Sequence, residues 1–175
     1  MIGRLQTTPA KDRPDLLAPA VAQAVADGIV SDAEVAAIDP ELADTASLSE
    51  AYDVPMEVSA NCVIVTGRRG GEQRHAACVV LAHTRADVNG VVRRHLQARK
   101  ASFASTDFAT EATGMEYGGI TPVGLPAGWL VLVDAQVVAT PQVVIGSGIR
   151  GSKLVLPGAA LADLPGAEVI DGLAG

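Results

Sequence analysis

Aromatic side chains are scarce in this chain, since Phe, Trp and Tyr together make up 3% of its 175 residues. A hydrophobic core must therefore be built mainly from Val, Leu, Ile and Ala. The hydrophobic content of 49% and the mean hydropathy of +0.29 argue against disorder. No apolar run approaches the roughly 18 residues of a membrane span, and the N-terminal residues lack the apolar segment of a signal peptide. We predict a single cytoplasmic domain over residues 1–175, with a flexible lead over residues 1–13 and no membrane partner.

Positive charge is also in short supply. Thirteen Lys and Arg residues against twenty Asp and Glu residues give a net charge of −7. This balance argues against a protein that coats DNA or RNA, because nonspecific binding depends on neutralising phosphates. A local basic patch remains open, and the densest cluster on a predicted helix is Arg93, Arg94, Arg99 and Lys100. These side chains either contact a nucleic-acid end or form an ordinary solvated helix face. A smaller cluster lies in the turn at Arg68 and Arg69.

Cysteine and histidine are too few and wrongly spaced for a metal site. Cys62 and Cys78 lie on successive predicted strands, and His75 and His83 flank the second of them, but the spacing fits no zinc template. A Cys/His nucleophilic pair would need a third, orienting group, which the spacing does not supply. We predict no metal and no organic cofactor.

The spacing of apolar residues, glycines and prolines predicts an α/β organisation. Helices are expected over residues 14–26, 44–52, 88–99 and 106–112, and strands over 58–66, 74–83, 129–133, 142–145 and 153–156. The first two strands form a hairpin across the glycine-rich turn at residues 67–71. Residues 31–38 stay ambiguous, because Ser31 and Glu34 fit a helical capping box while the segment also suits an extended piece.

Residues 113–124 form the most informative segment, with four glycines and a proline in twelve residues. Glycines let a ligand approach the main chain closely, and Pro122 biases Thr121 toward an extended backbone. Such a loop presents backbone N–H groups to an oxygen-rich ligand, or it is simply a tight connection between a helix and a strand. A second glycine-rich segment, Gly146 to Gly151, matches G-x-G-x-x-G. A strand-like run follows it instead of the helix that a dinucleotide site requires.

The order Gly118-Gly119-Ile120-Thr121-Pro122-Val123-Gly124 resembles the GG-x-[ST]-P-x-G loop of the YbaK/prolyl-tRNA-synthetase-associated domain family. The likeness extends over most of the chain, from about Leu16 to Ile170. It implies an α/β (α+β) fold with a mixed, barrel-like sheet surrounded by helices. It also implies a trans-editing aminoacyl-tRNA deacylase, which removes a small amino acid from a mischarged tRNA such as tRNA-Pro. Its partners would be the aminoacyl-tRNA 3′ end and an aminoacyl-tRNA synthetase.

The same resemblance assigns roles to individual residues. Asn61 occupies the place of a lysine that is central to the active site in the family, and Gly118 and Gly119 supply backbone donors for catalysis. The implied substrate contacts are Tyr117, Thr121, Pro122, Gly124, Ser147, Gly148 and Arg150. The candidate tRNA contacts come from the clustering of positive charge instead, and they are Arg93, Arg94, Arg99 and Lys100. Because Asn61 carries no positive charge, the alternative is a noncatalytic module that binds aminoacyl-tRNA or a synthetase.

Overall fold

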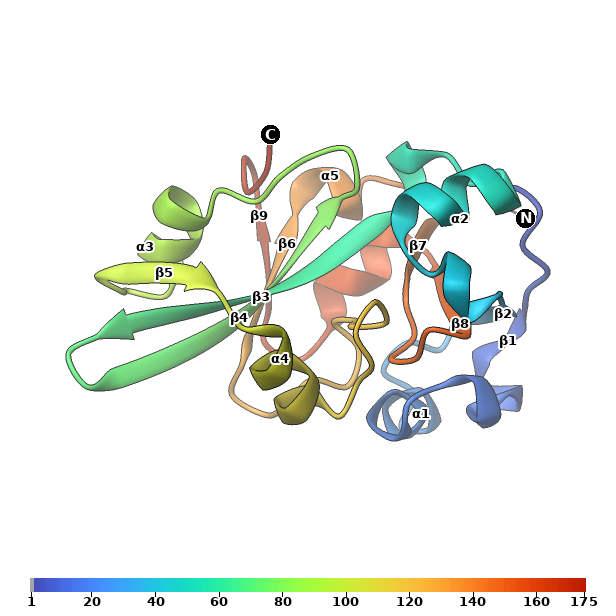
Figure 1. Ribbon diagram of the computed structural model, residues 1–175, viewed down its shortest axis with the longest axis horizontal. Helices are drawn as coiled ribbons and strands as arrows, with labels where there is room; N and C mark the ends of the chain where they lie inside the picture. Colours follow the sequence, from blue (N-terminus) through green and yellow to red (C-terminus); the bar gives the residue numbers. More distant parts are fainter. Residues whose placement is uncertain (1) are drawn as a thin grey trace.

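The computed structural model describes residues 2–175, which form two β-sheets with helices packed around them (Figure 1). The four-stranded sheet has the order β1-β2-β8-β7, formed by β1 (Thr8–Pro9), β2 (Glu34–Ala37), β8 (Ser152–Leu156) and β7 (Val143–Gly146). The five-stranded sheet has the order β5-β3-β4-β6-β9, formed by β5 (Lys100–Phe103), β3 (Ala60–Arg69), β4 (Glu72–Leu81), β6 (Leu130–Asp134) and β9 (Ala167–Ile170). The α-helices are α1 (Pro19–Ala26), α2 (Thr45–Tyr52), α3 (Arg93–His95), α4 (Thr106–Thr113) and α5 (Ala135–Val138).

The predicted mixed α/β class is confirmed, but the strands form two sheets rather than one closed barrel. In the larger sheet β3 and β4 are the predicted antiparallel hairpin, and β6 and β9 add to it in parallel. A parallel bridge between Ser59 and Val144 connects the start of β3 to β7 of the smaller sheet. The far end of the hairpin projects from the body of the molecule (Figure 1). One end of β3 therefore lies between the sheets, and the other reaches outward.

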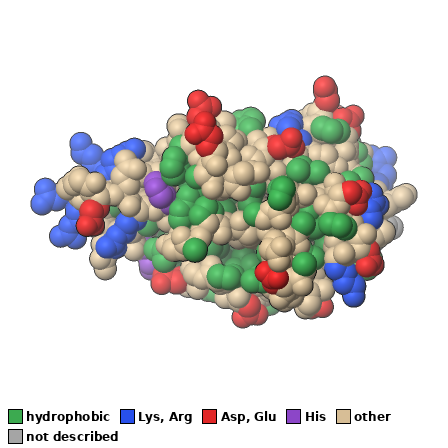
Figure 2. Space-filling view, turned by 90° about the horizontal axis from the view of Figure 1, so that it is seen from below, with side chains coloured by type: hydrophobic (Ala, Val, Ile, Leu, Met, Phe, Trp, Pro, Cys, Tyr) green, Lys and Arg blue, Asp and Glu red, His purple; other side chains and the backbone are tan. Residues whose placement is uncertain are grey.

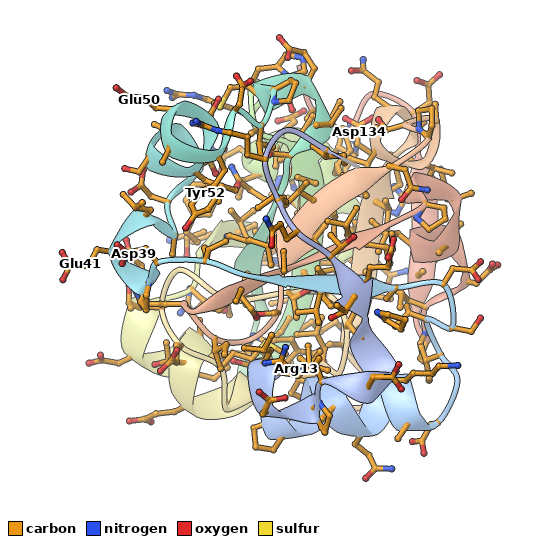
Figure 3. The ribbon with its side chains drawn as sticks, turned by 90° about the vertical axis from the view of Figure 1, so that its right-hand side faces the viewer. Arg13, Asp39, Glu41, Glu50, Tyr52 and Asp134 are labelled. Atoms are coloured by element: carbon orange, nitrogen blue, oxygen red, sulfur yellow. The ribbon has the colours of Figure 1, made fainter. Side chains whose placement is uncertain are left out.

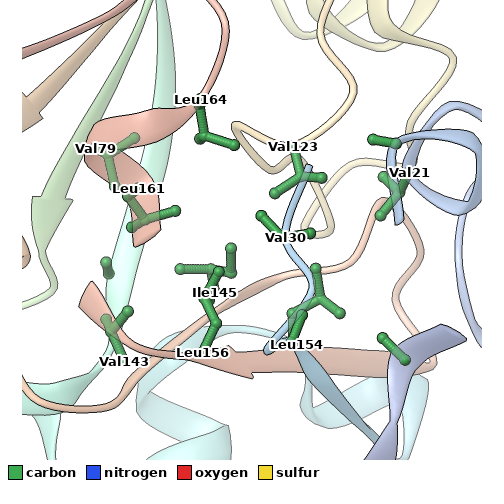
Figure 4. Close-up of a cluster of buried hydrophobic side chains, with 14 of the residues drawn as sticks. Val21, Val30, Val79, Val123, Val143, Ile145, Leu154, Leu156, Leu161 and Leu164 are labelled. Atoms are coloured by element: carbon green, nitrogen blue, oxygen red, sulfur yellow. The ribbon is translucent and has the colours of Figure 1, made fainter. Parts of the chain in front are cut away.

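The side-chain alternation of β8 positions the site. Leu154 and Leu156 belong to a buried cluster that includes Ile145 of β7 and Val21 of α1 (Figure 4). Val155 packs on the opposite face, in a separate cluster beneath α2. Because successive strand residues point to opposite faces, Lys153 lies on the same face as Val155, toward α2.

Two predicted helices are shorter than the sequence suggests. Over residues 14–26 a single 3-10 turn, Pro14–Leu16, precedes α1, and Ala18 between them is extended (φ −62°, ψ 153°). Pro19 disfavours a helical conformation in the residue before it, which explains the break. Over residues 88–99 a π-helical turn, Val88–Val92, leads into α3. The left-handed Gln97 (φ 52°) follows α3, and Lys100 already belongs to β5, a strand that the sequence pattern did not reveal.

The N-terminal part packs against the fold. A flexible lead is predicted over residues 1–13, whereas Leu5 and Ala10 are each 1% exposed and Thr8–Pro9 pairs with β2. Residues 31–38, ambiguous in sequence, contain β2, which pairs with β8. Met1 lies outside the described residues. No helix within residues 2–175 combines the length and the apolar character that crossing a membrane requires.

Candidate functional site

A pocket of about 330 Å3 lies where the start of β3, the N-terminus of α2, the glycine loop and β8 meet. We call it the Lys153 pocket, and its lining residues are Ala43, Asp44, Thr45, Ala60, Asn61, Cys62, Val63, Tyr117, Gly118, Ile120, Gly146 and Lys153. Ligand sites of this size are typically apolar with a few well-placed polar groups. The lining is more polar than that, because small apolar side chains alternate with an amine, an amide, a carboxylate and the hydroxyls of Thr45 and Tyr117.

Lys153 is the buried cation of this pocket. It is 9% exposed and lies in a strand whose other members are all buried. The two ion pairs within residues 2–175 join Arg13 to Asp15 and His95 to Glu168, and no side-chain hydrogen bond in that range involves Lys153 Nζ. Burial lowers the pKa of Lys153, the positive charge of Arg150 lowers it further, and Asp44 opposes both. The amine therefore reaches the pocket without a protein partner.

Asn61 lines the same pocket from β3. Thr45 Oγ1, in the first turn of α2, donates a hydrogen bond of 3.0 Å to Asn61 Oδ1. The side chain of Asp44 caps α2 by accepting from Ser47 N at 3.0 Å, and this backbone hydrogen bond is the main cause that lowers the pKa of Asp44. The predicted helix start at Asp44 thus holds both a carboxylate and the partner of Asn61 at the pocket wall.

The elements around α2 are tied together by backbone and side-chain hydrogen bonds. Asp39 N donates to the hydroxyl of Tyr52 at 2.9 Å, which joins the turn before α2 to its last residue (Figure 3). Arg150 Nε donates to Pro40 O at 3.2 Å and Nη1 donates to Tyr117 O at 3.1 Å. Arg150 is thereby a brace between that turn and the glycine loop, which positions the loop over the pocket.

The glycine loop contributes Tyr117 and Gly118 to the pocket. Gly118 is left-handed (φ 86°), a conformation that favours glycine, and Tyr117 is 66% exposed. Gly119 N donates to Glu116 O at 2.9 Å and so is not free for a ligand. Gly118 N, by contrast, has no acceptor among the described residues. Of the two predicted backbone donors, the structure leaves Gly118 available.

Other glycines of the two glycine-rich segments serve packing. A Cβ on Gly119 would lie 2.7 Å from Ile149 O, and a Cβ on Gly124 would lie 2.6 Å from Ala20 O. A Cβ on Gly148 would lie 2.3 Å from the Ala18 side chain. These glycines let segments of the protein approach each other, so they do not leave space beside the main chain for a ligand.

The predicted substrate contacts do not all converge on one place. Thr121 is fully buried, and its hydroxyl has no partner among residues 2–175. Ser147 is also fully buried and bonds Ser152, whose hydroxyl donates to it at 2.7 Å. Pro122 and Gly124 line a separate, mostly apolar groove of about 540 Å3 between α1 and the segment around Trp129. Sequence order alone could not separate these surroundings, because neighbouring loop residues point in different directions.

The four predicted tRNA contacts gather at the projecting end of the hairpin. Arg93, Arg99 and Lys100 line a shallow depression together with Arg68 of β3, and Arg94 is exposed on α3. Arg93 Nε donates a hydrogen bond of 2.8 Å to Asn89 O, which restrains the side chain of Arg93. Figure 2 shows a group of Lys and Arg side chains at this end of the molecule, with further basic side chains at the opposite end and acidic side chains spread over the surface. A chain with net charge −7 thus carries a local basic patch.

Two other chemistries find little support in the pocket. Cys62 lines it, but burial raises the pKa of the Cys62 thiol, which disfavours the nucleophilic thiolate. Within residues 2–175, no three His, Cys, Asp or Glu side chains come together in a way that would hold a metal ion. Lys153 is the residue that sequence reasoning missed at this site. Its signal was a lone charge in an otherwise apolar strand, at residues 152–156.

Comparisons with known proteins bear on the family and the fold of the chain. Residues 39–164 match the sequence model of a family described as the aminoacyl-tRNA editing domain. A protein named as a candidate trans-editing enzyme for prolyl tRNA synthetase has a TM-score of 0.74 and 20% identity, with coverage of 89% of this chain and 97% of that chain. Hypothetical protein APE2540 has a TM-score of 0.76 and 20% identity, with coverage of 89% and 99%. At this identity the structural likeness establishes the fold.

Proposed function

Because the chain belongs to the family of aminoacyl-tRNA editing domains, we propose that it hydrolyses the ester of a mischarged tRNA in trans. The observation that carries the proposal is the Lys153 pocket, in which Lys153, Asn61 and Gly118 converge on one small space. Its few polar groups would bind the ester and the terminal ribose, while its small apolar residues would surround the amino acid. We expect a small amino acid because the family resemblance implies one, and the apolar residues of the lining include the small side chains Ala43 and Ala60.

Editing of this kind has a clear physical reason. A synthetase pocket rejects a smaller amino acid by only about 1–3 kcal/mol per missing methylene, so a second site must remove what the first admits. The structural relative named after prolyl tRNA synthetase makes tRNA-Pro carrying a small amino acid the first substrate to test. Such a function would bring the protein to the aminoacyl-tRNA 3′ end and near a synthetase.

The basic patch supports binding of the tRNA body. Arg68 lies seven residues from Asn61 along β3, which corresponds to about 23 Å at 3.3 Å per residue. A tRNA whose terminal nucleotide enters the Lys153 pocket would therefore meet the patch with phosphates several nucleotides away. Contacts of this type raise affinity without selecting the amino acid.

The experiment is a deacylation screen with a panel of mischarged tRNAs, starting with alanine on tRNA-Pro. For at least one tRNA that carries a wrong, small amino acid, we expect hydrolysis above the spontaneous rate. For a tRNA that carries its own, larger amino acid, we expect no hydrolysis above that rate. Replacement of Arg93, Arg94, Arg99 and Lys100 by glutamine should reduce the slope of log K against log salt by about 0.7–0.9 for each phosphate that the protein no longer neutralises. Arg13→Gln is the matched control, because Arg13 is an exposed arginine already paired with Asp15.

The second candidate is a noncatalytic module that binds aminoacyl-tRNA. It is favoured by Asn61, which is uncharged and has its carbonyl oxygen engaged by Thr45. Saturable tRNA binding with no hydrolysis across the whole panel would support this function and refute the deacylase.

A further inference from the structure

We propose that Lys153 supplies the positive charge of this site and binds the carbonyl oxygen of the aminoacyl ester. The proposal rests on the proposed deacylase function and adds the residue that acts on the ester. It also assigns that role to a strand of the smaller sheet, although the family resemblance directs attention to Asn61 on β3.

Burial without a partner is the first observation. Lys153 is 9% exposed, flanked by fully buried Ser152 and Leu154, and its Nζ forms no hydrogen bond or ion pair with a described residue. Buried ammonium groups are normally paired, because burying an unpaired charge is costly. The fully buried side-chain atoms without a partner among residues 2–175 are Ser59 Oγ and Thr121 Oγ1. Lys153 Nζ is therefore open to the pocket, where a ligand is able to supply its acceptor.

The neighbouring groups leave the amine available to such a ligand. Asp44 is an opposing charge that acts on Lys153, but its carboxylate accepts the capping hydrogen bond from Ser47 N. Arg150 adds positive charge from the turn before β8, and its guanidinium already donates to main-chain oxygens. Cys62 and Tyr117 are the other titratable side chains of the lining. The pocket therefore favours an electron-rich oxygen over another cation.

The position of Lys153 brings it to the loop. It pairs with Gly146 of β7, and a Cβ on Gly146 would lie 2.6 Å from Gly119 O and 2.7 Å from Ile120 O. Because Gly146 has no side chain, the glycine loop lies close to β7 and beside Lys153. Asn61 on β3 and Lys153 on β8 line the same pocket. The positive charge that Asn61 lacks is therefore supplied to the pocket by Lys153.

The chemistry balances with water as the only co-reactant. The water oxygen bonds to the acyl carbon, the bond from that carbon to the ribose oxygen breaks, and a proton from water passes to the ribose oxygen. Negative charge develops on the carbonyl oxygen in the transition state. An ammonium already positioned beside the carbonyl oxygen stabilises that charge without having to reorganise during the reaction.

The test compares kcat/KM for a hydrolysed mischarged tRNA across four proteins: wild type, Lys153→Gln, Lys153→Arg, and Asn61→Lys combined with Lys153→Asn. We expect Lys153→Gln to reduce kcat/KM by about 10²- to 10³-fold, the usual loss for one oxyanion donor. Lys153→Arg should retain more activity, and the double variant should recover at least about tenfold over Lys153→Gln. Lys11→Gln is the control, since Lys11 is exposed.

A pH profile separates a charge from a mere packing role. The ratio of wild-type to Lys153→Arg activity should fall as pH rises, because lysine loses its proton and arginine keeps it. A base role would make the ratio rise, and a structural role would leave it flat; either result overturns the proposal.

A second experiment uses the wild-type protein. Its three lysine amines are labelled chemically, and mass spectrometry measures the extent of labelling at each lysine. A mischarged acceptor-stem analogue with an amide in place of the ester should protect Lys153 and leave Lys11 reactive. Unchanged labelling of Lys153, or Lys153→Gln within about twofold of wild type, refutes the role of Lys153 while the deacylase function stands. A wild type that hydrolyses no tRNA of the panel refutes both.

Discussion

Replacing Lys153 by methionine is expected to stabilise the fold while it removes activity. Methionine has an unbranched side chain of similar length, so the substitution leaves little cavity. The change removes an ammonium that is 9% exposed and has no partner among the described residues. If Lys153 formed a stabilising ion pair, its replacement by methionine would instead destabilise the fold.

The magnitude follows from the cost of burying charge. Replacing a buried ion pair by apolar side chains of similar volume is often neutral or stabilises the protein by about 1–4 kcal/mol, and Lys153 lacks even the partner that offsets part of the cost in such a pair. For a chain of this size, each kcal/mol shifts the melting temperature by about 2–4 °C. We therefore expect Lys153→Met to melt at least about 2 °C above wild type at neutral pH. Lys11→Met, at an exposed lysine, should stay within about 0.5 kcal/mol.

The sign of the pH dependence gives a sharper check. Burial lowers the pKa of Lys153 in the folded state, so between that pKa and the ordinary lysine value of about 10.4 the unfolded chain binds more protons. The buried charge of Lys153 thus lowers the stability of the wild type by its full amount below the folded-state pKa, and this loss of stability shrinks as pH rises through that pKa. Urea unfolding across this range should show the advantage of Lys153→Met shrinking toward high pH. A variant less stable than wild type at neutral pH, or a constant gap, would refute the unpaired-charge argument.

Two further predictions concern the framework of the fold. Gly119→Ala should lower the free energy of unfolding by about 1–3 kcal/mol, because the new Cβ would lie 2.7 Å from Ile149 O. Chemical denaturation measures this loss against the control Gly71→Ala, whose Cβ would meet nothing within 4 Å. Equal stabilities of the two variants would contradict the prediction. Asp134→Ala should cost about 1–3 kcal/mol, since Asp134 is 2% exposed and accepts from Gln136 N and Ala174 N at 3.0 Å; an unchanged unfolding midpoint would show that water replaces both hydrogen bonds.

Much of the framework followed from local sequence signals. The alternation of apolar residues and the glycines at 67–71 predict the β3–β4 hairpin, and the capping side chain of Asp44 marks the start of α2. The glycine loop together with the similar segments on either side of it places the chain in its family, which the match over residues 39–164 confirms. Each of these signals depends on residues close together in the chain, where geometry is set by backbone angles and short side-chain contacts.

The composition of the site was decided by tertiary structure. Asn61 and Lys153 lie in one pocket although 92 positions separate them, because the bridge between Ser59 and Val144 brings β3 against the smaller sheet. The same packing turns Gly119 toward Ile149 and makes it a structural glycine. Sequence predicts which residues are able to donate, accept or carry charge. Which of them face one another depends on how two separately formed sheets pack, and that is set by buried contacts between distant segments.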